Sequence, residues 1–307
     1  MPQTILPEGA NQNTYNRLKN MTTQIIEEAL LKHEILEAIA VACDTEHNLS
    51  VNLGCMKGII PHHEGAIGIA EGLTRDIAII SRVGKAVCFV VDGFTTDRNG
   101  ERIAVLSRRK AQERCMTEYI SKLQPGDVIP AKVTHIESFG AFCDIGCGIA
   151  ALMPIDTISV SRISNPKDRF CVGDNIKAVV KSTADGKVTL SMKELLGTWE
   201  QNASLFSQGE TVSGIIRSVE SYGVFVELTP NLAGLAESRP DAEVGQTASV
   251  YIKSIIPEKM KVKLIIVDAF AGDDSPLPIK YFYRENHLDH WIYSPKNCIK
   301  TIESVFR

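Results

Sequence analysis

The sequence predicts an all-β protein with short linker helices, built as three tandem five-stranded barrels. The first observation behind this prediction is an internal repeat, which defines the folding unit. The chain contains "HIESFGAFCDIG" at 135–146 and then "SVESYGVFVELT" at 218–229. The second observation is that each copy divides into short β-prone runs separated by turn residues.

The repeat extends well beyond the quoted segments. The two copies align without a gap from Pro125 to Leu152, which match 208–235. Further on, Val172-Gly173 matches Val244-Gly245, so the second copy is shorter than the first between these points. A fainter third copy lies upstream, where 56–64 resembles 149–157 and 101–110 resembles 186–195. This upstream copy has no aromatic-Gly-x-Phe motif.

The clearest copy holds five predicted strands in about 70 residues. They include "VIPAKVTHI", "AFCDIG", "IAALMPI", "DNIKAVVKS" and "KVTLSM", and "ADGK" is typical of a hairpin between the last two. No amphipathic helix is long enough to cover a sheet, so we expect a closed antiparallel barrel. Residues 156–173 are too long for a plain hairpin and are predicted to hold a short helical turn that caps the barrel.

The predicted domain organisation follows from these copies and from helical patterns between them. It comprises a disordered N-terminus plus helix (1–33), a divergent docking or structural barrel (34–110), a linker helix (111–124), a barrel (125–196), a linker (197–207), a barrel (208–270) and an aromatic-rich C-terminal extension (271–307). Helical patterns cover 20–33, 108–123 and 195–206.

The composition sets limits on the class of protein. The 44% apolar and 23% charged fractions are ordinary for a globular chain, and the net charge of −4 argues against binding duplexes by charge alone. We expect no secretory signal and no membrane span. Eight cysteines form no C-x-x-C pair, so reduced thiols are expected.

The repeated aromatic residues are the main candidates for binding. Phe139 and Phe142, with Gly140 predicted to turn the chain between them, match Tyr222 and Phe225 in the second copy. Two rings on the outer face of a small barrel would form a stacking platform for unpaired bases, which needs little positive charge. The alternative is that these rings belong to the core.

Basic residues are predicted to line the same faces and to contact phosphates, which sets position rather than sequence. The candidates are Lys132, Lys181 and Lys187 in the first of the two clear copies and Arg217, Lys253, Lys261 and Lys263 in the second. For each lysine, a solvated surface position is the alternative.

The whole pattern resembles the repeat of the small-subunit ribosomal protein S-one family. The elements are Gly126-Asp127, Phe139-Gly140-Ala141-Phe142, Ala151-Leu152, Val172-Gly173-Asp174 and Leu190-Ser191-Met192-Lys193. The resemblance covers about 34–270 and implies oligonucleotide-binding (OB-fold) barrels that bind single-stranded RNA.

The resemblance also implies roles for individual residues. The family's stacking rings fall on Phe139, Phe142, Tyr222 and Phe225, and its basic residue of the last hairpin falls on Lys187 and Lys261. The family's frequent histidine on the third strand is replaced by Pro154 and Glu237. The upstream copy lacks both rings and resembles repeats that dock on protein.

Other chemistry finds little support in the sequence. His62-His63-Glu64 could begin a metal or acid–base site, but no third ligand is identifiable. There is no phosphate-binding Gly-rich loop and no nucleophile elbow. We therefore expect no enzyme activity, no cofactor and no metal. The rings of the C-terminal extension are expected to pack on the last barrel, with an extension of the RNA path as the alternative.

The sequence thus favours a bacterial, cytoplasmic, non-enzymatic protein that holds mRNA at the small ribosomal subunit, with subunit proteins contacted through 34–110. A protein-interaction scaffold and an accessory RNA-binding subunit of an RNA-processing complex remain alternatives.

Overall fold

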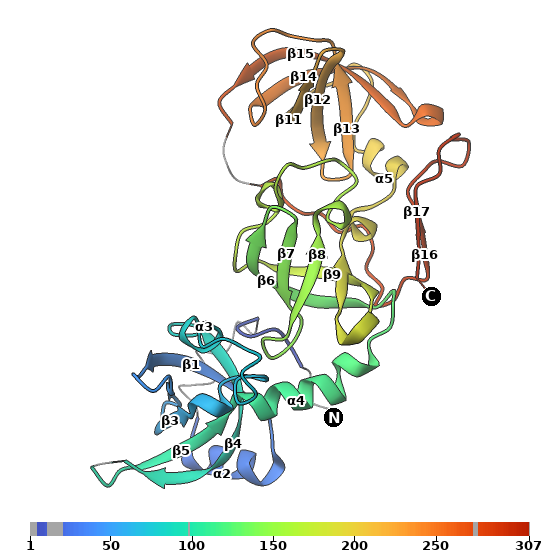
Figure 1. Cartoon of the computed structure of the whole chain (residues 1–307). Coiled ribbons are helices and arrows are strands. Elements are labelled where there is room, and N and C mark those ends of the chain that lie inside the picture. The colour runs from blue at the N-terminus through green and yellow to red at the C-terminus, as the bar shows by residue number, and fades with distance from the viewer. Residues whose placement is uncertain (1–4, 11–20, 98, 273–275, 307) are drawn as a thin grey trace. The chain divides into compact units, whose positions relative to one another are not determined.

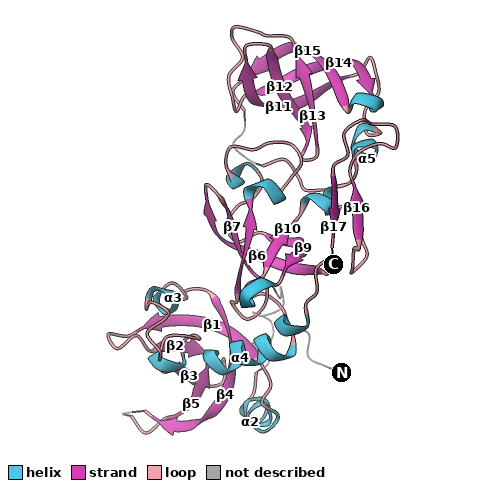
Figure 2. Cartoon of the chain, turned by 45° about the vertical axis from the view of Figure 1, so that its right-hand side comes forward, coloured by secondary structure: helices cyan, strands magenta, loops and turns pink. Residues whose placement is uncertain are grey.

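The computed structural model describes residues 5–10, 21–97, 99–272 and 276–306. These residues form three closed five-stranded barrels and a separate two-stranded sheet. Strands dominate and helices are short (Figures 1 and 2). The predicted fold class is confirmed. No helix among the described residues is long and apolar enough to cross a membrane.

Barrel 1 comes from the faint upstream copy of the repeat. Its strands are β1 (Leu36–Cys43), β2 (Leu49–Asn52), β3 (Lys57–Ile60), β4 (Ala86–Thr96) and β5 (Arg102–Ser107). A 3₁₀ turn, η1 (His62–Glu64), and a short helix, α3 (Ile77–Ile80), lie in the long connection between β3 and β4. The core of this barrel is apolar and includes Leu49, Val51, Ile60, Phe89 and Leu106.

Barrels 2 and 3 come from the two clear copies. Barrel 2 comprises β6 (Val128–Glu137), β7 (Gly140–Asp144), β8 (Ala150–Pro154), β9 (Asn175–Ser182) and β10 (Thr189–Ser191). Barrel 3 comprises β11 (Thr211–Glu220), β12 (Gly223–Thr229), β13 (Leu232–Ala236), β14 (Thr247–Ile256) and β15 (Lys261–Phe270).

The sequence predicted purely antiparallel barrels, and this detail of the prediction is wrong. In each barrel the third and fifth strands pair in parallel: Gly58 lies opposite Ala104, Leu152 opposite Thr189, and Leu235 opposite Lys263. This pairing closes the sheet, and closure removes the exposed strand edges. Sequence periodicity shows which residues form strands but contains no information on which strand closes the barrel.

Helices begin and end close to the predicted positions. They are α2 (Thr23–Lys32), α4 (Arg108–Glu118) with the 3₁₀ turn η2 (Ile120–Lys122), and η6 (Lys193–Leu196) with α5 (Trp199–Ala203). Thr22, Ser107 and Thr198 each cap a helix by accepting a hydrogen bond from a main-chain amide of the first turn.

The C-terminal extension packs its rings into the protein. It forms a sheet of β16 (His290–Ile292) and β17 (Glu303–Val305), and Trp291 and Tyr293 are buried in one cluster with Trp199 and barrel 3 residues. The extension also contacts barrel 2, where the hydroxyl of Tyr281 accepts a hydrogen bond from the Lys177 amide at 2.9 Å. The expected packing on barrel 3 is therefore present, and contact with barrel 2 accompanies it.

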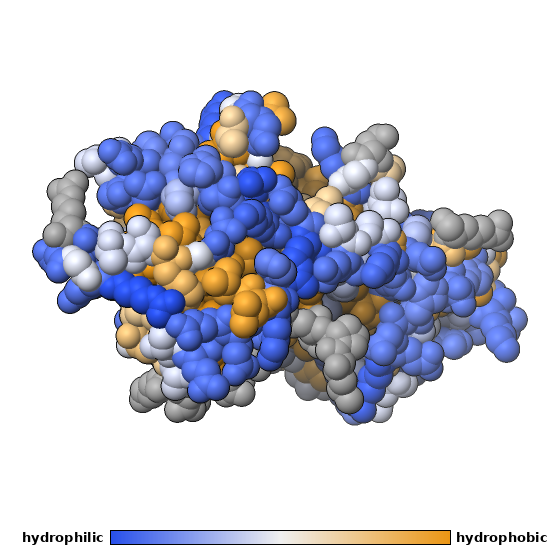
Figure 3. Space-filling view, turned by 90° about the horizontal axis from the view of Figure 1, so that it is seen from below, coloured by the Kyte–Doolittle hydropathy of each residue, from blue (hydrophilic) through white to orange (hydrophobic). Residues whose placement is uncertain are grey.

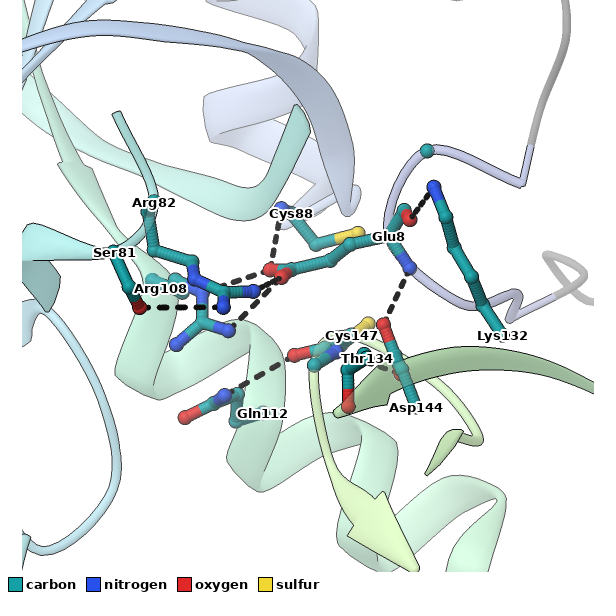
Figure 4. A network of polar contacts seen from close by, with 12 residues as sticks. Glu8, Ser81, Arg82, Cys88, Arg108, Gln112, Lys132, Thr134, Asp144 and Cys147 are labelled. Carbon is teal, nitrogen blue, oxygen red and sulfur yellow. Dashed lines mark hydrogen bonds and ion pairs between the residues drawn. The ribbon is translucent and has the colours of Figure 1, made fainter. Parts of the chain in front are cut away.

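The described residues cluster into two compact units. The first contains 1–123, 130–132 and 144–150, and the second contains the remainder. In the first unit, Glu8 is buried and pairs with Arg108, whose Nε lies 2.7 Å from Oε1 (Figure 4). Residues 5–10 are thus ordered by this pair, which differs from the disorder expected there. The rest of the predicted disordered segment, 1–4 and 11–20, lies outside the described residues.

The pKa values of the two carboxyl groups in this network, Glu8 and Asp144, are shifted in opposite directions. Burial works against the charge of Glu8, but the charge and hydrogen bonds of Arg108 outweigh it and lower the pKa of Glu8. Burial raises the pKa of Asp144 to about 7, and the charge of Glu8 adds to the rise. Asp144 nonetheless accepts the Glu8 amide at 2.7 Å, so the two acidic residues are held together through the main chain.

In the second unit, the long segment between β8 and β9 joins barrel 2 to barrel 3. One short helical turn was predicted here, and the segment contains two, η3 (Ile155–Thr157) and η4 (Pro166–Asp168). Next to η4, Arg169 pairs with Glu227 of β12, Nη2 to Oε1 at 2.5 Å, and both side chains are 0% exposed. Burial lowers the pKa of Arg169, and the charge of Glu227 acts against that change. The long β8–β9 segment of barrel 2 therefore contacts barrel 3 through a buried ion pair.

We expect Glu227→Gln to lower the free energy of unfolding by about 3 kcal/mol, because it leaves the Arg169 guanidinium buried without a counter-charge. Urea unfolding would measure the loss. Glu220→Gln, at an exposed position of β11, is the matched control and should change stability by less than about 0.5 kcal/mol. Equal effects of the two substitutions would contradict a stabilising role for the buried pair.

Candidate nucleic-acid interface

The two pairs of repeated rings have the same geometry. Phe139 and Phe142 have centroids 6.1 Å apart with an interplanar angle of 90°. Tyr222 and Phe225 have centroids 6.2 Å apart with an angle of 87°. Edge-to-face contacts of this kind are favourable between aromatic rings. Each pair is therefore a fixed right-angled corner, built twice by the same local sequence.

The rings of each pair occupy a turn and a strand. Glu220 pairs with Gly223, so Ser221 and Tyr222 form a two-residue turn, and Phe225 follows on β12. Phe139 holds the equivalent place between β6 and β7. The exposed fraction is 53% for Phe139 and 67% for Tyr222. The outermost ring of each pair thus lies at the surface rather than in the core.

The glycine of each motif has a different role from the expected one. Gly140 begins β7 instead of turning the chain, and a Cβ atom there would lie 2.5 Å from the Met153 carbonyl oxygen. At Gly223, a Cβ atom would lie 2.5 Å from the Ala236 carbonyl oxygen. The glycines therefore allow the ring-bearing strand to approach the third strand closely, which holds the hairpin against the barrel.

A histidine that sequence reasoning missed lies beside one ring pair. The His135 ring has its centroid 6.3 Å from that of Phe142, at an angle of 31°. Its Nε2 also lies 2.7 Å from the Glu137 carboxylate. The second copy has Ser218 at the equivalent position, so the repeat itself concealed this residue. Barrel 2 consequently offers three rings where barrel 3 offers two.

Strand register brings several predicted lysines toward the rings. In barrel 3, Phe225 pairs with Leu235, and Leu235 pairs with Lys263. Lys253 lies at the bulge where the register of β14 shifts opposite Lys263. Lys261 lies two residues before Lys263 and so points to the same face. The ring strand and the basic hairpin are two strands apart on one outer surface.

Barrel 2 repeats this arrangement with fewer charges. Leu152 pairs with Thr189, which stands where barrel 3 has Lys263. Lys181 lies at the bulge of β9, as Lys253 does on β14. Lys187 precedes Thr189 by two residues, and both lysines are exposed. Their roles in binding stay predictions.

Two predicted basic residues form short contacts with the protein itself, and Lys253 Nζ also lies 4.0 Å from Glu237 Oε1. Lys132 donates a hydrogen bond from Nζ to the Glu8 carbonyl oxygen at 3.1 Å. Arg217 pairs with Glu227 and with Asp168, whose Oδ1 lies 3.0 Å from Nη1, and its side chain is 12% exposed. These contacts give both residues an internal partner.

Part of the chain is similar to a known family of RNA-binding domains. Residues 122–193 match the family model of the S1 RNA binding domain. The predicted resemblance is confirmed. The small ribosomal subunit protein bS1 of Leuconostoc lactis is 29% identical over 222 residues, covering 71% of this chain and 50% of that protein. The bS1 protein of Staphylococcus aureus is 26% identical over 267 residues, covering 81% and 65%.

The chain therefore spans 50–65% of the length of these two curated relatives. Among solved structures, a multidomain protein with nucleic acid binding domains from Streptococcus pneumoniae covers 82% of this chain and 76% of its own at 14% identity. The TM-score of 0.24 is too low to support an argument.

We expect Gly140→Ala to destabilise the protein by about 1–3 kcal/mol, because the added methyl group meets main-chain atoms that cannot rotate away. Thermal unfolding would measure the change. Gly93→Ala, in a strand of barrel 1 with open space around it, is the control and should have little effect. A fully stable Gly140→Ala protein would show that close approach of the strands is not required.

Proposed function

We propose that this protein is a non-enzymatic, cytoplasmic, single-stranded RNA-binding protein that holds mRNA at the small ribosomal subunit. The observation that carries the proposal is the repeated right-angled ring pair on the outer surface of barrels 2 and 3. Exposed rings stack on bases of any sequence, each stacked base contributing roughly 1–3 kcal/mol. The relatives named small ribosomal subunit protein bS1 support the ribosome as the place of action.

The near-neutral charge fits stacking better than charge-driven binding. The lysines near the rings are few, and the whole chain carries a net charge of −4. Few phosphate contacts release few counterions, so affinity should fall only slowly with salt. Most of barrel 2 and all of barrel 3 belong to one compact unit, in which the Arg169–Glu227 pair joins them. An RNA strand that is bound by one barrel is thereby held near the other barrel at a high local concentration.

Barrel 1 is proposed to contact proteins of the small subunit. Its corner between β1 and β2 has no Phe or Tyr ring, and the connection between β3 and β4 exposes several apolar side chains, namely Ile67, Leu73, Ile77, Ile80 and Val83. The view in Figure 3 shows apolar residues gathered at the surface. Exposed apolar patches of this kind are typical of protein–protein interaction sites.

The decisive measurement is affinity for an unstructured oligo-U of about 20 nucleotides across a salt series. We expect Phe139→Ala, Phe142→Ala, Tyr222→Ala and Phe225→Ala together to weaken binding at least roughly 100-fold, since each lost stacking contact is worth about 1–3 kcal/mol. Circular dichroism would establish that the variant is folded.

The control is Phe270→Ala, which removes an exposed ring at the far end of β15 and should leave affinity unchanged. Equal binding by the fourfold variant, or no binding by the wild type, would refute the stacking proposal and favour a protein-interaction scaffold. If the fourfold variant loses affinity as expected, sedimentation of the wild type with small subunits would separate a ribosomal role from that of an RNA-processing accessory subunit.

A further inference from the structure

Barrel 1 brings together three potential metal ligands from three separate segments. His47 lies in the connection between β1 and β2, His62 begins η1, and Asp76 directly precedes α3. One ligand atom from each residue lies within 4.8 Å of the other two. His62 Nε2 is 2.7 Å from Asp76 Oδ1, and His47 Nδ1 is 3.3 Å from Asp76 Oδ2. Of the predicted His62-His63-Glu64 cluster, only His62 belongs to this group, and the fold supplies the other two ligands.

The segment that carries His47 is held by its own hydrogen bonds. The Asp44 carboxylate accepts the amides of Glu46 at 3.0 Å and Asn48 at 2.8 Å. This closes a tight turn in which His47 has φ of 62°. The Asn48 side-chain oxygen then accepts the His62 amide at 2.9 Å. These hydrogen bonds position the main chains of the two histidines relative to each other.

The spacing of the ligand atoms suits a small divalent ion. Zinc binds imidazole nitrogen and carboxylate oxygen at about 2.0–2.2 Å in tetrahedral geometry, which places ligand atoms about 3.3–3.5 Å apart. The two histidine–aspartate separations, 2.7 Å to Oδ1 and 3.3 Å to Oδ2, are within about 1 Å of that spacing. All three ligand atoms lie within 4.8 Å of one another. The side chains are 37%, 38% and 46% exposed, so a water molecule can reach a fourth position.

We propose that His47, His62 and Asp76 bind one Zn²⁺ ion or a similar imidazole-preferring divalent metal ion, with water as the fourth ligand. Three protein ligands and an open position are the pattern of exchangeable or reactive zinc sites rather than closed structural ones. Without metal, the same residues form a hydrogen-bonded His–Asp–His group, which is the competing explanation of the cluster.

The location of this cluster in its barrel supports a binding role. In barrel 2, the Ile155 amide, directly after β8, donates a hydrogen bond to the Phe139 carbonyl oxygen. In barrel 1, the His62 amide, two residues after β3, donates to Asn48 in the corresponding connection. The corner that presents an aromatic ring in barrel 2 therefore presents the histidine–aspartate cluster in barrel 1. Barrel 1 would use this corner for a metal ion instead of a base.

The test is binding of Zn²⁺ to the full-length reduced protein, measured by competition with a chromogenic chelator. We expect one ion per chain at this site. His47→Ala, His62→Ala and Asp76→Asn should each weaken binding by at least about 10-fold. Loss of a residue that only hydrogen-bonds a metal ligand already costs about 10- to 100-fold, and these three residues are direct ligands. Asn48→Ala should weaken it about 10- to 100-fold, because Asn48 positions both histidines.

His63→Ala is the matched control, because His63 is adjacent in sequence, 67% exposed and directed toward Glu64. It should leave affinity unchanged. Co²⁺ provides a second readout, since coordination by nitrogen and oxygen gives visible absorption without a thiolate charge-transfer band. Absence of Zn²⁺ binding, unchanged binding by the His47 and His62 variants, or a thiolate band from Co²⁺ would overturn the proposal.

Discussion

The short parallel pairing between the third and fifth strands is the contact on which each barrel depends. Only one or two residue pairs form it in each barrel, such as Leu235 with Lys263 and Ala236 with Leu264. It closes the hydrogen-bonding circuit, and it also sets which side chains of the last strand face inward. Val262 and Leu264 enter the core, so the lysines between them and before them face outward. The same contact therefore builds the core and carries basic residues to the ring strand.

One frame thus supports different surfaces at the same corner. In barrels 2 and 3 the first hairpin is tight, and a glycine lets it lie against the third strand, which presents two rings at right angles. In barrel 1 the corresponding connection is longer and polar, and its own turn hydrogen bonds position His47. The difference arises in a few residues of one loop, while the strand order is unchanged.

Much of the fold could be predicted because the repeat is local and periodic. The strands, the helices between the barrels and the ring pairs all follow from patterns within a few residues of one another. Contacts between distant residues could not be predicted. Arg217 was predicted to contact phosphates, but Glu227 and Asp168 hold it. His62 appeared to lack partner ligands, because His47 and Asp76 belong to other segments and reach it only through the fold. Lys132 similarly meets the Glu8 main chain, which is far away in sequence.

The buried pair of Arg169 and Glu227 has a consequence for how this sequence can change over time. Both side chains are fully enclosed; Glu227 is the ion-pair partner of Arg169 and also pairs with Arg217. Loss of Glu227 alone leaves Arg169 as a buried charge without its ion-pair partner, which gives a strongly destabilised intermediate. A substitution at Glu227 is therefore expected to be accepted only together with a substitution at Arg169. The long β8–β9 segment of barrel 2, which carries Arg169, therefore limits the substitutions that β12 of barrel 3 can accept.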